Sequence, residues 1–514
     1  MRQRRFIFNN DGSFLLSNSL HGGRELTVDD VHGYVDQAAG TGVTSFFICS
    51  GSSMPYYSSR CERTIGCLNA DTPAGDGGHP HGADNCALYG AHAQALARQG
   101  TDIIEQCVGR AHSQGMEAGI SMRMNDLHFN DPAICFPLGQ GDFWLQHPEY
   151  HLGDQAPKGW HTTGALDFSH QAVRQYKLDL FEEICTGYDA DAVELDFMRF
   201  PVYFPAGQGS ECTELMTEFV RQARQLVRDT AAQRGRPLEL GIRLPVEMKG
   251  ARFLGFDPVT YAREGLIDFI TVTPFLHDVP CVPVEAFRGE LGDDDVPLYA
   301  GMMSNAPSGP LSHGALRAHA ANAYRAGADG LCLFNFFFLG DSEPEGRVVH
   351  GPCRHLLHEL GDAAKLAGRN KLYDAGCRAG YADVDPAAEL PAQIMPGEAL
   401  ELGISVAEAA TPAMPPVLFV GTGSAGKLSC EWNGRALDRT DSSPADYGAG
   451  RDAGDDGQVT AFALSDAELR CGTNTVRLCA SDGGELPDVE LPVVELRCVE
   501  LAVECGPVEE CGRF

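Results

Sequence analysis

Two carboxylates interrupt an apolar run in the segment DAVELDFMRFP, residues 191–201. Its valine, leucine and phenylalanine alternate with Glu194 and Asp196, which is the pattern of a β-strand with one apolar face. Side chains that point away from the packing helices of such a strand face the interior of a barrel. We therefore expect both acids there, with Asp196 nearer the open end and exposed in a solvent-filled cup. Paired carboxylates at such a place can act as a nucleophile and a general acid–base.

The next strand-like segment, LELGIRLPVEM at 238–248, offers a partner for Asp196. Alternation places Arg243 on the inward line of this segment and continues that line to Glu247. Neighbouring strands lie about 4.8 Å apart, which suits the roughly 5–5.5 Å between the carboxyl groups of a retaining glycosidase. In that arrangement one of the two carboxylates, Asp196 or Glu247, is the nucleophile and the other is the acid/base.

Two alternatives to this pair stay open. An inverting reaction needs a wider gap between its carboxylates to admit water, and Asp126 and Asp278 are candidates for it across the mouth. The simpler alternative is that the acids only hold loops, through ion pairs with Arg199 and Lys249.

Charged residues of both signs fall on the inward lines of adjacent strands. Arg123 lies on the inward line of the segment at 116–126, beside the segments that carry Glu194 and Arg243. An unpaired charge buried there would cost several kcal/mol. We therefore expect Glu194 to form a paired layer with Arg243 or Arg123.

Short β-rich runs alternate with helical stretches from residue 5 to about residue 370. The expected strands are 5–11, 43–50, 116–126, 191–197, 238–247, 268–274, 297–303 and 330–336. Helical periodicity, often ending at a glycine, marks the segments between them. Eight β-then-α units predict an α/β fold, a (β/α)8 TIM barrel with its site at the C-terminal ends of the strands. The rival, an open doubly wound sheet, usually begins with a GxGxxG turn, which NNDGSF at 9–14 lacks.

Loop lengths and a change from helical periodicity to short β runs indicate further divisions of the chain. Long loops follow the second and third strands, at about 51–101 and 127–169, and loops of this length usually form functional walls or lids. After about residue 375 short β runs separated by Gly, Asp and Pro replace the helical pattern. We expect a catalytic barrel at 1–375 and a β-sandwich accessory domain, jelly-roll-like, at 376–514.

Further residues on the expected catalytic face could contact a sugar. Aromatic rings stack on the apolar faces of pyranose rings, and Tyr57 and Trp160 lie in loops where they could do so. The polar residues that could bind hydroxyl groups are Asn125, Asp126, His128, His161, Glu194, Arg199, Arg243, His277 and Asn335. The expected partner is a carbohydrate, and no cofactor or metal is expected.

A longer stretch resembles a known group of barrels. HTTGALDFSHQAVRQYKLDLFEEI, followed by YDADAVELDFMRFP, is similar to the core of a glycosyl-hydrolase-like (β/α)8-barrel family. In that family an LD-SHP-VR-Y helix start precedes a DG-hLDyhRyP strand. The Asp-x-x-Arg-x-Pro part is intact at Asp196, Arg199 and Pro201, whereas Gln171 replaces the usual proline. The match covers residues of about 160–205.

These barrels are distantly similar to the α-amylase and α-galactosidase superfamilies. The resemblance implies that the aspartate of the fourth strand, here Asp196, is the nucleophile. The acid/base would be Glu247 in an amylase-like scheme and Asp278 in a galactosidase-like scheme.

Two rivals from other classes compete with a glycosidase. A metal-dependent hydrolase could use Asp11, Asp126 and His128, while His79 and His81 form a His-x-His pair that lies within a loop rather than at the end of the first strand. A barrel that binds carbohydrate without catalysis is the second rival.

Composition excludes some partners. A formal net charge of −32 argues against nucleic acid and anionic membranes, because the surface would repel phosphates. No apolar run approaches the roughly 18 residues of a membrane span, and MRQRRFIFNNDGSF lacks the apolar stretch of a signal peptide. These features predict a cytoplasmic protein, and homo-oligomerisation is left open. The 18 cysteines form no CxxC pair, which favours reduced thiols.

Overall fold

The structure is a computed structural model in which the chain forms two compact units. The described residues are 4–17, 23–78, 84–159, 162–292, 294–306, 309–336, 353–376, 390–407, 414–423, 428–450, 453–454, 456–464, 469–480 and 493–505. The first unit comprises Met1–Phe275, Glu285–Gly301 and Cys332–Phe337. The second comprises Leu276–Val284, Met302–Leu331 and Phe338–Phe514.

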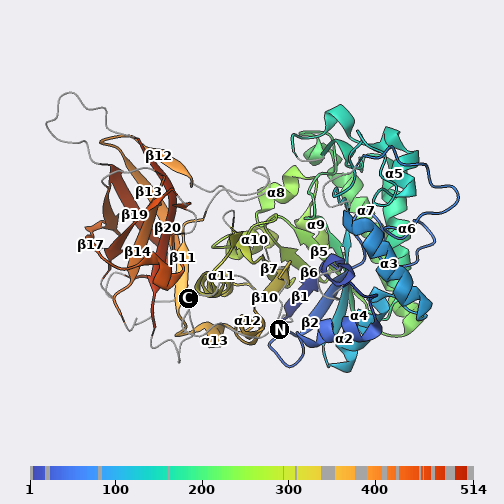
Figure 1. The fold of residues 1–514 in the computed structure, drawn as a ribbon, viewed down its shortest axis with the longest axis horizontal. Coiled ribbons are helices and arrows are strands. Elements are labelled where there is room, and N and C mark those ends of the chain that lie inside the picture. Colours follow the sequence, from blue (N-terminus) through green and yellow to red (C-terminus); the bar gives the residue numbers. More distant parts are fainter. Residues whose placement is uncertain are drawn as a thin grey trace. The chain divides into compact units, whose positions relative to one another are not determined.

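Eight parallel strands close into a barrel in the order β1-β10-β7-β6-β5-β4-β3-β2 (Figure 1). The strands are β1 (Phe6–Asn10), β2 (Ser45–Cys49), β3 (Glu117–Arg123), β4 (Ala192–Asp196), β5 (Glu239–Leu244), β6 (Phe269–Val272), β7 (Leu298–Met302) and β10 (Gly330–Phe334). Each lies within a strand range expected from the sequence. The TIM barrel is therefore confirmed.

Helices connect these strands. They are α1 (Ser13–Leu16), α2 (Val28–Asp36), α3 (Asp84–Arg98), α4 (Ile103–Ser113), α5 (Asp142–Gln146), α6 (Gln171–Gly187), α7 (Thr213–Arg234), α8 (Met248–Phe253), α9 (Pro258–Arg263), α10 (Val284–Leu291) and α11 (His313–Arg325), with α12 (Arg354–Glu359) and α13 (Ala363–Leu366) after the last strand. Short 3-10 helices are η1 (Pro148–Tyr150), η2 (Gly153–Gln155), η3 (Thr162–Gly164), η4 (Gly209–Cys212) and η5 (Pro444–Tyr447). The helix α2 begins with a capping box, in which Thr27 and Asp30 each accept a hydrogen bond from the other's backbone N–H.

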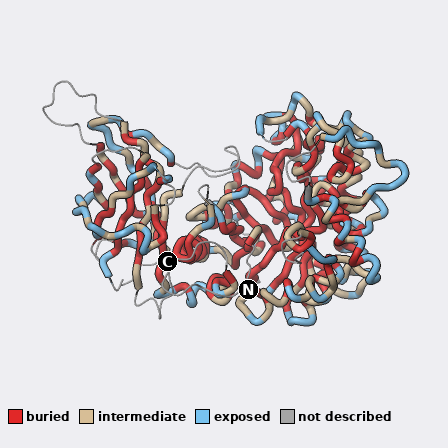
Figure 2. The backbone as a smooth tube through the Cα atoms, viewed as in Figure 1, coloured by how far each residue is buried: buried red, intermediate tan, exposed pale blue. Residues whose placement is uncertain are grey.

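The barrel strands are buried along nearly their whole length (Figure 2). One apolar cluster joins Ile7, Phe47, Ala192, Phe269, Tyr299 and Cys332. Two glycines leave room for its rings, because a Cβ on Gly119 would lie 2.3 Å from the Phe47 ring and one on Gly241 would lie 2.1 Å from the Phe269 ring. Both glycines are therefore needed for the interior to close.

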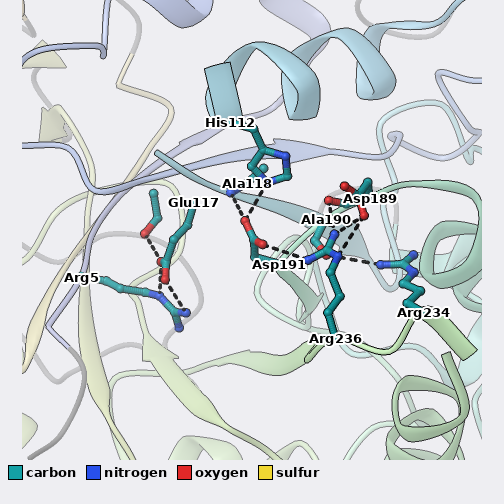
Figure 3. A network of polar contacts seen from close by, with 10 residues as sticks. Arg5, His112, Glu117, Ala118, Asp189, Ala190, Asp191, Arg234 and Arg236 are labelled. Atoms are coloured by element: carbon teal, nitrogen blue, oxygen red, sulfur yellow. Dashed lines mark hydrogen bonds and ion pairs between the residues drawn. The ribbon is translucent and has the colours of Figure 1, made fainter. Parts of the chain in front are cut away.

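Polar contacts join the strands at their N-terminal ends (Figure 3). Arg5 forms an ion pair with Glu117 at 2.7 Å. Asp191 contacts Nε2 of His112 at 2.8 Å and pairs with Arg236 at 3.1 Å. Enzymes with this fold carry their sites at the opposite face, so we assign these contacts to stability.

Antiparallel sheets make up much of the second unit. The six-stranded sheet contains β11 (Lys371–Asp374), β20 (Val494–Val503), β14 (Val417–Thr422), β18 (Gln458–Ala463), β17 (Asp438–Thr440) and β12 (Ala392–Ile394). The four-stranded sheet contains β13 (Ala399–Val406), β19 (Gly472–Ala480), β15 (Leu428–Trp432) and β16 (Arg435–Ala436), and β8 (Asn305–Ala306) pairs with β9 (Gly309–Pro310).

The two larger sheets share one apolar core, as in a sandwich. Trp432 and Leu478 come from one sheet and Leu418 and Leu496 from the other, and all four are in the same buried cluster. Ala318 of α11 belongs to it as well. The second unit thus includes α11 and β11, which lie ahead of the expected boundary after residue 375.

Within the described part of the chain, no helix is both long enough and apolar enough to cross a membrane. Cys49, Cys332 and Cys498 are buried free thiols. Cys61 and Cys67 are free thiols too.

Candidate functional site

The carboxylate of Asp196 lies at the C-terminal end of β4. Its Oδ1 accepts hydrogen bonds from the backbone N–H groups of Met198 at 2.9 Å and Arg199 at 3.2 Å. Its Oδ2 is buried and has no hydrogen-bond partner among the described residues. It forms an ion pair with Nη1 of Arg243 at 3.7 Å. The described residues thus orient one oxygen of Asp196 and donate no hydrogen bond to the other.

The expectation that Asp196 opens into a solvent-filled cup is wrong. Asp196 is 1% exposed. The ring of Phe334, at the end of β10, lies 4.6 Å from the guanidinium carbon of Arg243, 5.8 Å from that of Arg123 and 6.0 Å from that of Arg199. These side chains fill the space in front of Asp196. The alternating pattern of a single strand does not reveal them, because they come from other strands and loops.

The buried layer of opposite charges is confirmed, with Arg243 as the partner of Glu194. Nη2 of Arg243 donates to Oε1 of Glu194 at 2.9 Å. Ser121 donates to the same oxygen at 2.8 Å, and Thr271 donates to Oε2 at 3.1 Å. Glu194 is fully buried. With Nδ2 of Asn9, which donates to Oε1 at 3.4 Å, side chains from four strands of the barrel hold this carboxylate.

Asp126, His128 and Arg199 form a chain of contacts beside Asp196's loop. Nη2 of Arg199 donates to Nε2 of His128 at 2.8 Å, and Nδ1 of His128 lies 2.6 Å from Oδ1 of Asp126. Arginine can only donate, so Nε2 accepts and the proton of a neutral imidazole is on Nδ1. Burial also lowers the pKa of His128, although Asp126 acts against this.

Asp126 is a poor candidate for a proton donor. Burial would raise its pKa, but contacts with His128 and Arg123 outweigh this and hold the pKa well below its usual range. Nη1 of Arg123 donates to Oδ2 of Asp126 at 2.9 Å, and its Nη2 lies 3.6 Å from Asp11. Asp11 and Asp126, two of the expected metal ligands, therefore both lie next to the Arg123 guanidinium. Within the described ranges, no three or more His, Cys, Asp and Glu residues are grouped to hold a metal.

Two expected sugar-binding residues hold loops together. The Asn125 amide donates to the carbonyls of Leu166 at 3.0 Å and Val202 at 2.5 Å, and accepts from the Leu166 N–H at 3.2 Å. The Tyr57 hydroxyl donates to Glu183 of α6 at 3.3 Å. Both side chains are buried.

Glu247 lies beyond the end of β5, at the N-cap position of α8. The residue opposite Asp196 in the parallel register is Arg243 rather than Glu247. Oε2 of Glu247 forms an ion pair with Lys249 at 2.7 Å, and the Glu247 side chain is 27% exposed. This carboxylate therefore has access to solvent, which Asp196 lacks.

Asp278 belongs to the second unit, where His319 lies between two carboxylates. Nδ1 of His319 is 2.9 Å from Asp278, and Nε2 is 2.7 Å from Asp374. Burial would lower the pKa of His319, but the two carboxylates outweigh it and raise the pKa to about 10. Burial raises the pKa of Asp278, while the contact with His319 opposes the rise.

His319→Gln is expected to lower the free energy of unfolding by about 3 kcal/mol near pH 6.5, because it leaves the buried Asp278 and the partly buried Asp374 without their cation. A raised pKa makes the charged form stabilising below the unfolded value, so this contribution is complete below about pH 6.5 and is lost as the pH rises through about 10. Urea unfolding from pH 6.5 to 10 checks this. A difference that grows with pH would contradict it, and His147→Gln, at a more exposed ion pair, is the control.

Three bulky or polar residues adopt left-handed backbone conformations just after barrel strands. Phe200 follows β4 with a φ of 58°, Leu276 follows β6 with 64°, and Asn335 follows β10 with 51°. Such positions cost about 1–3 kcal/mol each and are concentrated at functional sites. Of the other expected site residues, His277 is half-buried next to Leu276, whereas Trp160 and His161, like His79 and His81, lie outside the described residues.

Phe334 was missed by the sequence interpretation. Cys332 faces the barrel interior, where its sulfur lies 3.7 Å from Nη2 of Arg243. Alternation then puts Phe334 on the same inward line, one step nearer the mouth. The segment GLCLFNF carries this signal.

No protein-family model and no curated protein matches the chain. Among solved structures, the endo-β-1,4-mannanase of Thermotoga petrophila is similar at 10% identity and a TM-score of 0.44, over 97% of this chain and 98% of that one. An α-galactosidase of Lactobacillus brevis is similar at 15% identity and a TM-score of 0.40, over 93% of this chain and 55% of that one. A GH36 α-galactosidase variant of Geobacillus stearothermophilus follows at 12% and 0.38, over 93% and 56%.

The chain therefore spans about half the length of these α-galactosidases. The strand order of the closed barrel establishes the fold. The three solved structures named above, to which this (β/α)8 barrel is distantly similar, are glycoside hydrolases.

Proposed function

We propose that this protein is a glycoside hydrolase that acts on oligosaccharides, with Asp196 as the nucleophile. The observation that carries the proposal is the carboxylate itself: backbone N–H groups fix its Oδ1, while its Oδ2 has no donor among the described residues. A nucleophilic oxygen must be both oriented and free to attack. The left-handed residues that follow β4 and β10 lend support to a functional role for this face.

The proposal requires a movement at the mouth of the barrel. Asp196 is 1% exposed, so a sugar reaches it only if Phe334 and Arg199 shift when the substrate binds. Side-chain and loop movements of this kind exclude water and complete many active sites. Arg199 suits such a role, because its Nε and Nη1 have no hydrogen-bond partner in the described part of the chain.

For the acid/base, we favour Glu247 over Asp278. Glu247 is partly exposed, and its partner Lys249 is 70% exposed, so the ion pair can separate at little cost. Asp278 is buried and paired with the His319 imidazolium. A group that must give and take a proton needs the freedom that Glu247 has.

The test is a screen of the wild type against aryl glycosides of different sugars and natural oligosaccharides, with the product anomer followed by NMR. We expect turnover of at least one glycoside with retention of configuration. Asp196→Asn is expected to bind that glycoside without turning it over, while Asp154→Asn, at an exposed surface position, keeps full activity. Binding without turnover by the wild type would favour a non-catalytic carbohydrate-binding barrel instead.

Glu247→Gln is expected to slow hydrolysis by about 10²–10⁴-fold for leaving groups that need protonation. Leaving groups of low pKa depart without that help, so aryl glycosides such as dinitrophenyl compounds are expected to be much less affected. The measurement is kcat/KM across a series of leaving groups. Asp278→Asn is the matched variant, and a larger, leaving-group-dependent loss in it than in Glu247→Gln would move the role to Asp278.

A further inference from the structure

A hollow lies outside the barrel interior, between the loop after β2, the end of β3 and helix α6. Its cavity volume, counted as the space open to the centre of a water-sized sphere, is about 20 Å³. Its lining residues are Ser50, Gly51, Ser52, Ser53, Met54, Pro55, Tyr57, Met122, Arg123, Lys177, Leu180 and Ile184. All of them belong to the first unit. We refer to this set as the α6 pocket.

Lys177 is the unusual member of the α6 pocket. It lies on the buried face of α6, on the same side as Leu180 and Ile184, and only 6% of it is exposed. Among the described residues, no carboxylate forms an ion pair with it, and its Nζ lies 5.5 Å from the centre of the Tyr176 ring. A buried ammonium without a counter-charge is costly. Burial accordingly lowers the pKa of Lys177 to about 8, with Asp126 and Glu62 acting against it from a distance.

A second polar group in the α6 pocket also has no partner. The hydroxyl of Ser52 is buried and makes no hydrogen bond to any described residue. Apolar side chains, among them Met122 and Leu180, form the rest of the wall. The pocket thus offers a cation, a hydroxyl donor and an apolar surface to one small occupant.

We infer that the α6 pocket binds a small carboxylate anion, with the Lys177 ammonium as its charge partner. A carboxylate has two oxygens, so it can accept from Lys177 and from Ser52 while its carbon end lies against the apolar wall. The anion would provide the negative counter-charge that the described residues do not provide to the Lys177 ammonium. This inference does not depend on the proposed glycosidase reaction.

The test is saturation-transfer NMR with sodium acetate on the full chain. Wild-type protein is expected to bind acetate saturably, and Lys177→Met is expected to bind it at least about tenfold more weakly. Lys158→Met, at an exposed lysine, is the control and is expected to bind as the wild type does. Lys177→Met is also expected to melt no lower than the wild type without acetate, because it removes a buried unpaired charge.

Ser52→Ala provides a second variant if Lys177→Met does not fold. It keeps the ammonium and removes the hydroxyl, so acetate affinity is expected to fall by about threefold or more. Equal acetate binding by the wild type and Lys177→Met, or unchanged binding in Ser52→Ala, would overturn the assignment. Absence of saturable binding in the wild type, or binding of chloride without acetate, would overturn it as well.

Discussion

Replacing Glu194 with glutamine is expected to lower the free energy of unfolding by about 3–5 kcal/mol. The substitution removes the charge that Arg243 contacts at 2.9 Å, and leaves this fully buried guanidinium with Asp196 at 3.7 Å as its remaining ion-pair partner among the described residues. The measurement is urea denaturation at neutral pH, in which a shift of the midpoint at constant slope reports the change.

Two further variants test whether the loss of stability comes from the buried, unpaired Arg243. Glu182→Gln makes the same change on the exposed side of α6, and is expected to alter stability by no more than about 0.5 kcal/mol. The double variant Glu194→Gln with Arg243→Met is expected to recover part of the loss, because it removes the uncompensated cation. A Glu194→Gln protein as stable as the wild type would contradict the paired layer.

Asp196→Gly is expected to lower kcat by about 10³–10⁴-fold on the glycoside that the screen identifies. Glycine removes the attacking oxygen and leaves a space that a small anion can enter. Sodium azide is therefore expected to restore turnover and to yield a glycosyl azide with the configuration opposite to that of the substrate. The measurements are kcat with and without azide and NMR of the product.

Folding must be separated from chemistry in this experiment, because Asp196 also accepts from the backbone N–H groups of Met198 and Arg199. Asp196→Asn retains an oxygen for these contacts and is expected to lose activity without losing stability. Azide is expected to have no effect on the wild type. A kcat within about threefold of the wild type in either variant would place the nucleophile elsewhere.

The strands and the charged layer could be predicted because both follow from local rules. Alternation with a period of two assigns Glu194 and Arg243 to the barrel interior, and the cost of burying a charge requires that they pair. The eight-strand count came from the same periodicity. These inferences need no knowledge of which strands meet across the barrel.

The surroundings of Asp196 could not be predicted in this way. Whether the mouth of the barrel is open depends on Phe334. This residue is on β10, which lies near Asp196 only because β10 pairs with β1 in the closed barrel. Asn125 and Tyr57 are polar residues in the right region, but their hydrogen-bonding capacity is used by neighbouring loops and by α6. A sequence does not show which of its polar groups are already satisfied by distant segments.

Lys177 illustrates a signal that was present but not used. In the helix HQAVRQYKLDLFEEI it occupies the apolar stripe rather than the polar face. A lysine in that stripe either extends its end to solvent or needs a charge from outside the chain.

The segments of the two units alternate along the chain, and this affects the design of truncated fragments. The chain passes from one unit to the other at five places, the last of them between residues 337 and 338. A fragment that stops at residue 375 would retain β11 but lack β20, its antiparallel neighbour. The unpaired backbone N–H and C=O groups of β11 would then be exposed and could promote aggregation. Truncation is thus a poor route to an isolated barrel, and the whole chain is the sensible unit for expression.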